Sequence, residues 1–147
     1  MAQNGAYRNI GGSQYLLKPR DYAVQITHSG VAGSSNFNFI NIDPSAPFLL
    51  KLLCMEDTND PTTAAPGLAG QYENFVQVQD NSNNYTWENT FVPRSAFAGS
   101  REWPFRLPDE ILINANTKFT LTIQEPAAGN AVGTSTIIMK GYSLYPV

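Results

Sequence analysis

Two residues of this chain, His28 and Cys54, have side chains that could take part in nucleophilic catalysis. The 147 residues include one histidine and one cysteine, so a Ser-His-Asp or Cys-His arrangement would have to use His28. No local motif joins the two residues. Cys54 stands in an apolar run, Phe48–Met55, where burial would raise its thiol pKa. We therefore interpret Cys54 as a small buried hydrophobe that has no partner for an intrachain disulfide.

Carboxylates and amides offer two further kinds of chemistry. Glycosidase-type pairs can be drawn from Asp57, Glu73, Glu88 and Asp109, but any chain with 12 acidic residues offers such pairs. The stretch Asp80–Asn84 has the alternating oxygen ligands of part of an EF-hand loop, without its glycine or its final bidentate glutamate. A polar turn explains that stretch equally well, and a zinc site would need more His or Cys ligands. We expect no enzyme, no metal and no cofactor.

The charge of the chain is low and scattered. Charged residues make up 14% of the sequence and the net charge is -3, whereas about a quarter of residues are charged in an ordinary soluble domain. Nucleic-acid binding needs clustered Lys and Arg, so we do not expect it. The N-terminal segment lacks the apolar core of a secretory signal. No run approaches the roughly 18 apolar residues of a membrane span, so we expect a soluble chain, made in a cytoplasm, with no membrane partner.

Strands must position any functional residue, and the clearest strand follows a turn at Asn114–Asn116. Phe119, Leu121 and Ile123 alternate strictly with polar residues, which is the pattern of a half-buried strand. The prolines in and just after Trp103–Leu107 cannot donate to a sheet ladder. That segment is therefore predicted to be an edge or corner crossing.

Similar patterns predict further strands along the rest of the chain. They cover Tyr22–His28, Phe37–Ile42, Phe48–Glu56, Tyr72–Asp80, Tyr85–Phe91 and Thr134–Tyr145. The third of these is an apolar run interrupted only by Lys51 before its final Glu56, so periodicity alone does not separate a buried strand from a short helix, and its β surroundings favour a strand. In the last, Gly141 is predicted to form a bulge.

The strand Phe37–Ile42 carries apolar side chains on both faces. Phe37 and Phe39 share one face, and Ile40 and Ile42 share the other. We expect one face to contact the core and the other to contact a partner.

About eight or nine short strands without a helical stretch indicate an all-β fold. We predict a single antiparallel β-sandwich, jelly-roll-like, over residues 21–147. Residues 1–20 show no periodic pattern and are predicted to be either a disordered terminus or an extended N-terminal arm lying on a neighbour. Apolar and aromatic residues in that segment favour the arm.

Binding surfaces are the remaining source of function. Aromatic residues gather in the middle of the chain with arginines among them, as in binding hot spots. They are Tyr85, Trp87, Phe91, Phe97, Trp103 and Phe105, with Arg94, Arg101 and Arg106. Many of these rings could equally belong to the core, and exposed rings with amides would also suit a carbohydrate-binding module.

Several segments between Asn38 and Pro146 resemble a known group of proteins. They are FINIDPSAPFLLKLLCM, the WPF crossing, LPDEILINANTKFTLTIQE and the ending KGYSLYP, and the match is best from Pro104 onward. Together they resemble the small all-β structural proteins encoded in the virion gene blocks of tailed bacteriophages.

The resemblance implies a capsid decoration or cement protein that binds the assembled phage head. Its partners would be the major capsid protein and neighbouring copies of itself, at the capsid surface of the virion. We expect a homotrimer, with a monomeric unit as the alternative. We expect the contacts on the arm and on the long loop 57–71. The residues expected to contact the partners are Tyr7, Arg8, Ile10, Tyr15 and Leu68. The alternative is another virion component, such as a head-fibre base, tail or adaptor protein, with a glycan-binding β-sandwich.

Overall fold

The structure is a computed structural model that describes residues 6–59, 74–88, 90–93, 97–98, 105–125 and 133–147. Every element bounded within these ranges is a β-strand, and every pairing between them is antiparallel. The predicted all-β fold class is therefore confirmed.

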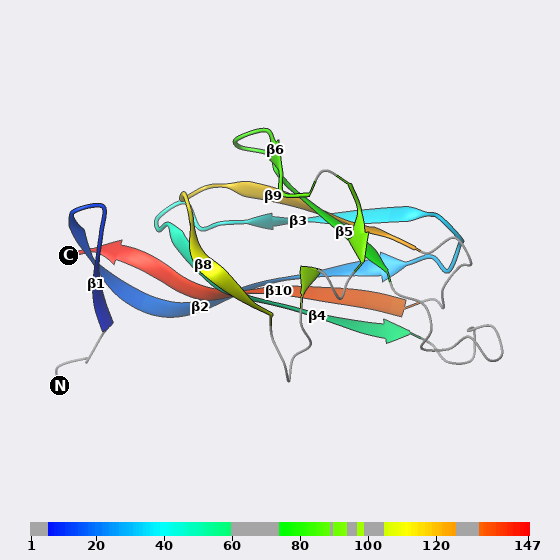
Figure 1. The fold of residues 1–147 in the computed structure, drawn as a ribbon, viewed down its shortest axis with the longest axis horizontal. Coiled ribbons are helices and arrows are strands. Elements are labelled where there is room, and N and C mark those ends of the chain that lie inside the picture. The colour runs from blue at the N-terminus through cyan, green and yellow to red at the C-terminus, as the bar shows by residue number, and fades with distance from the viewer. Residues whose placement is uncertain (1–5, 60–73, 89, 94–96, 99–104, 126–132) are drawn as a thin grey trace.

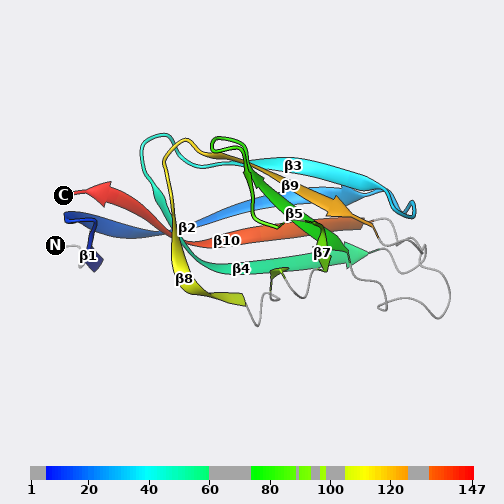
Figure 2. The same cartoon turned by 45° about the horizontal axis from the view of Figure 1, so that its top comes forward.

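The strands form two curled sheets. Sheet A has the order β1 (Ala6–Ile10), β2 (Ser13–His28), β10 (Gly133–Pro146), β4 (Phe48–Asn59) and β8 (Phe105–Ile113). Sheet B has the order β3 (Ser35–Asn41), β9 (Lys118–Gln124), β5 (Phe75–Asp80) and β6 (Tyr85–Thr86), with β7 (Val92–Pro93) also paired to β5. Figures 1 and 2 show β3 and β9 running along the same length of the molecule as β2, β10 and β4.

Both sheets contribute to one apolar core. Phe119, Leu121 and Ile123 of β9 are buried in it, so the alternation predicted for that strand is confirmed. From sheet A, Tyr22 and Phe48 enter the same core, with their rings edge to face and 4.9 Å between centroids. Burial of such side chains is the main force that holds the two sheets together.

Strand β4 is a central strand of sheet A, which explains why its sequence does not alternate. Leu50 and Leu53 lie in the shared core, while Leu49 and Cys54 are buried outside that cluster. A shift of register against β8 between Leu50 and Leu52 marks a bulge in the pairing. A strand buried on both faces reads as a continuous apolar run.

Two local predictions are confirmed by backbone geometry. Asn116 has a φ of 62° in the turn before β9, a conformation that asparagine tolerates better than most residues. The register between β10 and β4 shifts between Lys140 and Gly141, which is the predicted bulge.

The predicted start of the first strand at Tyr22 is wrong. The structure has a hairpin before it, in which β1 pairs with the beginning of β2 through a turn at Gly11 and Gly12. Both glycines have positive φ, 58° and 85°, as a two-residue hairpin turn of type I′ requires. Residues 13–20 thus belong to β2. They show no alternation because most of their side chains on both faces of the hairpin reach solvent.

The strand predicted over Tyr85–Phe91 is shorter in the structure. Only Tyr85 and Thr86 pair with β5. Trp87 N–H still donates to the Val78 carbonyl over 2.9 Å, but Val78 N–H donates to Glu88 Oε2 instead of to the facing backbone. The carboxylate replaces the next ladder partner, and the pairing ends there.

The segment predicted as a crossing lies partly within a strand. β8 begins at Phe105 and contains Pro108, and it lies at the edge of sheet A, where proline is tolerated. Trp103 and Pro104 lie outside the described residues.

Candidate functional site

Of the residues considered for catalysis, Cys54, Glu88 and Asp109 have side chains that the structure describes, whereas Glu73 and the side chains of His28 and Asp57 lie outside the described part of the chain. Cys54 is fully buried, and desolvation raises the pKa of its thiol. Desolvation likewise raises the pKa of Glu88, whose carboxylate accepts a hydrogen bond from Val78 N–H at 2.9 Å. His28 ends β2. No three His, Cys, Asp or Glu residues among those described gather as a metal site would require.

The calcium-like stretch Asp80–Asn84 is used by its own turn. Asp80 Oδ1 accepts from Ser82 N–H at 3.0 Å and from Asn83 N–H at 3.1 Å. Asp80 Oδ2 accepts from Asn83 Nδ2 at 2.7 Å. These are the bonds of an Asx turn, so the turn interpretation accounts for the aspartate's contacts.

The predicted contact residues of the N-terminal segment lie on a three-stranded ribbon. We define the ribbon as β1, residues 13–20 of β2 and residues 142–146 of β10, which pair with β2. In Figures 1 and 2 the ribbon extends beyond sheet B at the end of the molecule that carries both termini. The fifth predicted contact residue, Leu68, lies outside the described residues.

The ribbon divides these residues between its two faces. Arg8 is the cross-strand partner of Tyr15, and Tyr7 is the partner of Leu16. Partners in an antiparallel pair share a face and neighbours along a strand alternate, so Arg8, Ile10 and Tyr15 lie on one face and Tyr7 on the other. The Tyr7 side is open to solvent, since 55% of this residue is exposed.

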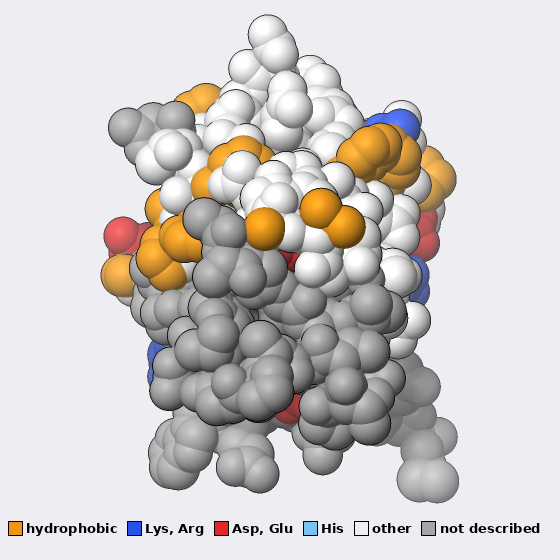
Figure 3. All heavy atoms as spheres, turned by 90° about the vertical axis from the view of Figure 1, so that its right-hand side faces the viewer, with side chains coloured by type: hydrophobic (Ala, Val, Ile, Leu, Met, Phe, Trp, Pro, Cys, Tyr) orange, Lys and Arg blue, Asp and Glu red, His pale blue; other side chains and the backbone are white. Residues whose placement is uncertain are grey.

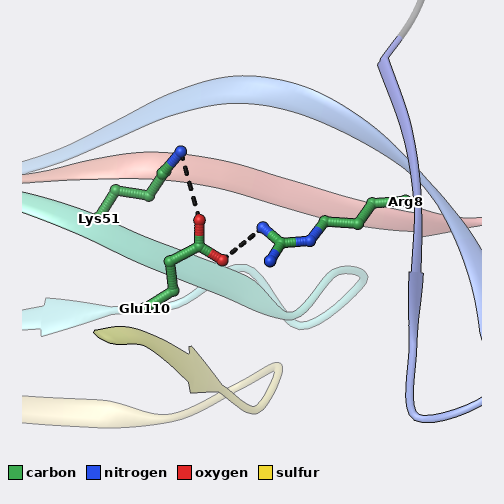
Figure 4. A network of polar contacts seen from close by, with 3 residues as sticks. All are labelled: Arg8, Lys51 and Glu110. Atoms are coloured by element: carbon green, nitrogen blue, oxygen red, sulfur yellow. Dashed lines mark hydrogen bonds and ion pairs between the residues drawn. The ribbon is translucent and has the colours of Figure 1, made fainter. Parts of the chain in front are cut away.

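Arg8 joins the ribbon to the opposite edge of sheet A. Its guanidinium forms an ion pair with Glu110 Oε2 of β8, while Lys51 Nζ of β4 lies 3.3 Å from Glu110 Oε1 (Figure 4). β1 and β8 are the two outermost strands of the sheet, so this contact requires the sheet to curl. The Glu110 carboxylate therefore links the two edges of the sheet. We call Arg8, Lys51 and Glu110 the clasp.

The electrostatics of the clasp favour the ionised carboxylate. Partial burial raises the pKa of Glu110, but hydrogen bonds from Lys51 and Arg8 and the two positive charges outweigh this and hold the pKa below its usual value. The pair remains partly exposed, with 48% of the Arg8 side chain and 25% of the Glu110 side chain accessible. Water therefore limits its stabilising effect.

A cleft of about 270 Å³ opens beside the clasp. It is lined by Arg8, Lys51, Arg106, Leu107, Pro108, Asp109 and Glu110. Lys51 also borders a second groove, of about 210 Å³, where its Nζ lies 5.4 Å from the centre of the Tyr142 ring and Lys140 is paired with Asp21 at 2.9 Å. Charged side chains of both signs line these hollows, and they include the ion pairs of the clasp and the pair of Lys140 with Asp21.

Two features, one in the clasp and one at the loop after β2, were missed from the sequence. Nothing in the sequence pairs Glu110 with Arg8, because that contact depends on how sheet A curls. Glu125 is buried and accepts hydrogen bonds from Ser29 Oγ and Gly30 N–H, each at 2.7 Å. A signal for it existed: it continues the buried alternation of Phe119 to Ile123.

No helix in the described residues has both the length and the hydrophobicity to cross a membrane.

At the end of the molecule opposite the ribbon, the described side chains that face the viewer are mostly uncharged (Figure 3). Comparison of the chain with protein-family models, with curated proteins and with solved structures found no match.

Proposed function

We propose that this chain is a structural subunit of a tailed-phage virion, a decoration protein that binds the assembled head and links neighbouring capsid subunits. Within the proposal, the two sheets form a single jelly-roll sandwich. The strand orders β2-β10-β4-β8 and β3-β9-β5-β6 support this, because from β2 to β10 the chain passes between the sheets at every connection except those within β5, β6 and β7, which all lie in sheet B. Jelly rolls occur in viral capsid and lectin domains, so this support is a fold-level analogy.

The ribbon is the observation that carries the proposal. It projects from the domain (Figure 1) and presents Tyr7 on one face and Arg8 with Tyr15 on the other. Tyrosine and arginine are the residue types that dominate binding hot spots. The clasp holds the middle of β1 against β8, so a contact made by Tyr7 would be transmitted to the whole of sheet A. The ribbon thus takes the role expected of the arm.

The mechanism would be mechanical. A subunit that contacts two capsid proteins, or that joins others in a trimer, binds through several weak contacts whose affinities multiply. Because such a subunit binds the assembled shell and not its separated parts, it would stabilise the shell by mass action.

Co-sedimentation with expanded phage heads that lack the protein tests this function. We expect saturable binding at a fixed ratio to the major capsid protein, and a loss of affinity of about tenfold or more for Tyr7→Ser, the cost of truncating one aromatic contact. Tyr85→Ser is the matched control, since Tyr85 is 61% exposed and lies on β6. Sedimentation velocity of the free protein tests the trimer.

Two results would count against the proposal. Absence of binding to heads would contradict the proposed function. Equal loss of binding for Tyr7→Ser and Tyr85→Ser would remove the ribbon as its contact surface.

A further inference from the structure

The outward face of sheet B carries two exposed phenylalanines and almost no charge. Phe37 and Phe39 of β3 are 62% and 40% exposed, while Ile40 of the same strand is buried in the core. This matches the expectation that one face of the strand contacts the core. Exposed phenylalanine side by side on a rigid strand leaves apolar surface in water, which has a free-energy cost unless a ligand covers it.

The register of the sheet extends this face into two rows. Phe37, Thr122 and Gln77 form one row across β3, β9 and β5, and Phe39, Thr120 and Gln79 form the next. Side chains paired in this way stand on the same face, with strands about 4.8 Å apart. Each row therefore presents one ring, one hydroxyl and one amide.

Two of the polar groups in these rows already have a hydrogen-bond partner, and each keeps the capacity for another bond. Asn81 Nδ2 donates to Thr120 Oγ1 at 2.7 Å, which leaves the hydroxyl hydrogen of Thr120 to donate. Gln77 Nε2 donates to the Glu88 carbonyl at 3.3 Å, which leaves the amide oxygen of Gln77 to accept.

The two rings are not equivalent. Their centroids are 5.5 Å apart with 66° between the planes, and Lys118 Nζ lies 4.0 Å from the centre of the Phe39 ring. Lysine therefore covers one face of Phe39. Phe37 is the ring on which a ligand would stack, and Lys118 would add one hydrogen-bond donor beside it.

We propose that this face binds a neutral saccharide, with a sugar ring stacked on Phe37 and its hydroxyls bonded to the threonines and glutamines. A sugar has an apolar C–H face and hydroxyls that both donate and accept, which matches rings beside hydroxyls and amides. An anionic or cationic polymer would need clustered opposite charge, and Lys118 is the one charged residue at these outward positions of β3, β5 and β9.

A second protein copy fits this face less well. A stable interface covers about 800 Å² on each partner around an apolar centre. Here the apolar part is the two rings of β3 at the edge of the sheet together with the half-buried Phe75 of β5, and the rest is hydroxyl, amide and Lys118. The saccharide proposal is independent of the proposed binding to heads.

Affinity electrophoresis in gels containing a neutral glucan, galactan, mannan or xylan tests the proposal, with dextran sulfate as the charged comparison. We expect retardation by at least one neutral polymer, a loss of at least tenfold in affinity for Phe37→Ala, and retained binding for Phe37→Trp. Tyr7→Ser should bind the polymer normally, whereas Phe37→Ala should bind heads normally, so the failures of the two proposals are distinguishable.

The same variants provide the outcomes that would overturn the proposal. Retardation by none of the neutral polymers would do so, as would equal retardation of the wild type and Phe37→Ala. A concentration-dependent dimer that Phe37→Ala dissociates would assign the face to a second copy instead. Since Phe37 is exposed, an unchanged unfolding midpoint should show that Phe37→Ala remains folded.

Discussion

Gly141 of β10 lies directly against the backbone of Leu49 in β4: a Cβ at position 141 would stand 1.9 Å from the Leu49 carbonyl oxygen and 2.9 Å from its carbonyl carbon. The obstacle is backbone in the middle of sheet A, so it cannot move aside as a flexible side chain would. We expect Gly141→Ala to lower the free energy of unfolding by about 3 kcal/mol, measured by urea denaturation.

The matched control for this change is Thr136→Ala, in the same strand. Thr136 is half-buried and pairs with Glu56 in regular register. Its substitution should cost about 0.5 kcal/mol, the size of a strand-propensity difference. Equal effects of the two substitutions would show that the bulge tolerates a side chain.

Glu125 fastens the loop between β2 and β3. Its carboxylate accepts from Ser29 Oγ, Gly30 N–H and Ser34 Oγ. Hydrogen bonds to a charged group are stronger than neutral ones, so Glu125→Ala should cost about 2 kcal/mol in unfolding free energy, and Glu125→Gln less. Gln124→Ala, which removes a side chain from the opposite face of β9, should change stability much less.

The clasp should make stability depend on pH. The pKa of Glu110 is lowered in the folded protein, so its contribution is complete above the unfolded-state pKa of about 4.3. It is lost as the pH falls through the lower folded-state pKa. We expect Glu110→Gln to cost about 0.5–1 kcal/mol at pH 7 and nothing once the wild-type carboxyl is protonated.

Denaturation of the wild type and of Glu110→Gln over a range of pH checks this. Asp109→Asn serves as the control, since Asp109 is exposed and lies next to Glu110 on the same cleft. A difference between wild type and Glu110→Gln that persists at low pH would exclude the ion pairs as its cause.

Cys54 should be unreactive in the folded protein. It is fully buried, and desolvation raises the pKa of its thiol, so little thiolate is present and reagents have no access. We expect its reaction with a disulfide reagent at pH 8 to be at least about 100-fold slower than that of an exposed thiol. Ser13→Cys combined with Cys54→Ala supplies that comparison, because Ser13 is exposed.

The sequence was sufficient to predict which residues enter the core where one face of a strand is buried and the other is exposed to solvent. The alternation of Phe119, Leu121 and Ile123 predicted the core face of β9, and the same alternation explains why Phe37 is exposed while Ile40 is buried. Gly141 was predictable as a bulge because glycine within a strand has few other uses.

Other features depend on three-dimensional context that local pattern does not contain. The hairpin of β1 was missed because neither of its faces is buried, so its residues have no reason to alternate. The early end of β6 depends on the Glu88 carboxylate reaching Val78 N–H. The cleft beside the clasp exists because sheet A brings Arg8 to Glu110, and no spacing in the chain encodes that meeting.

The contact between Arg8 and Glu110 also has a kinetic consequence. Arg8 and Glu110 are 102 positions apart, and a contact closed over so long a loop forms after most of the entropy of ordering has been lost. We therefore expect Arg8→Ala to speed unfolding and to leave the folding rate nearly unchanged. The clasp would then lengthen the lifetime of the closed sheet modestly, without changing how fast the sheet forms.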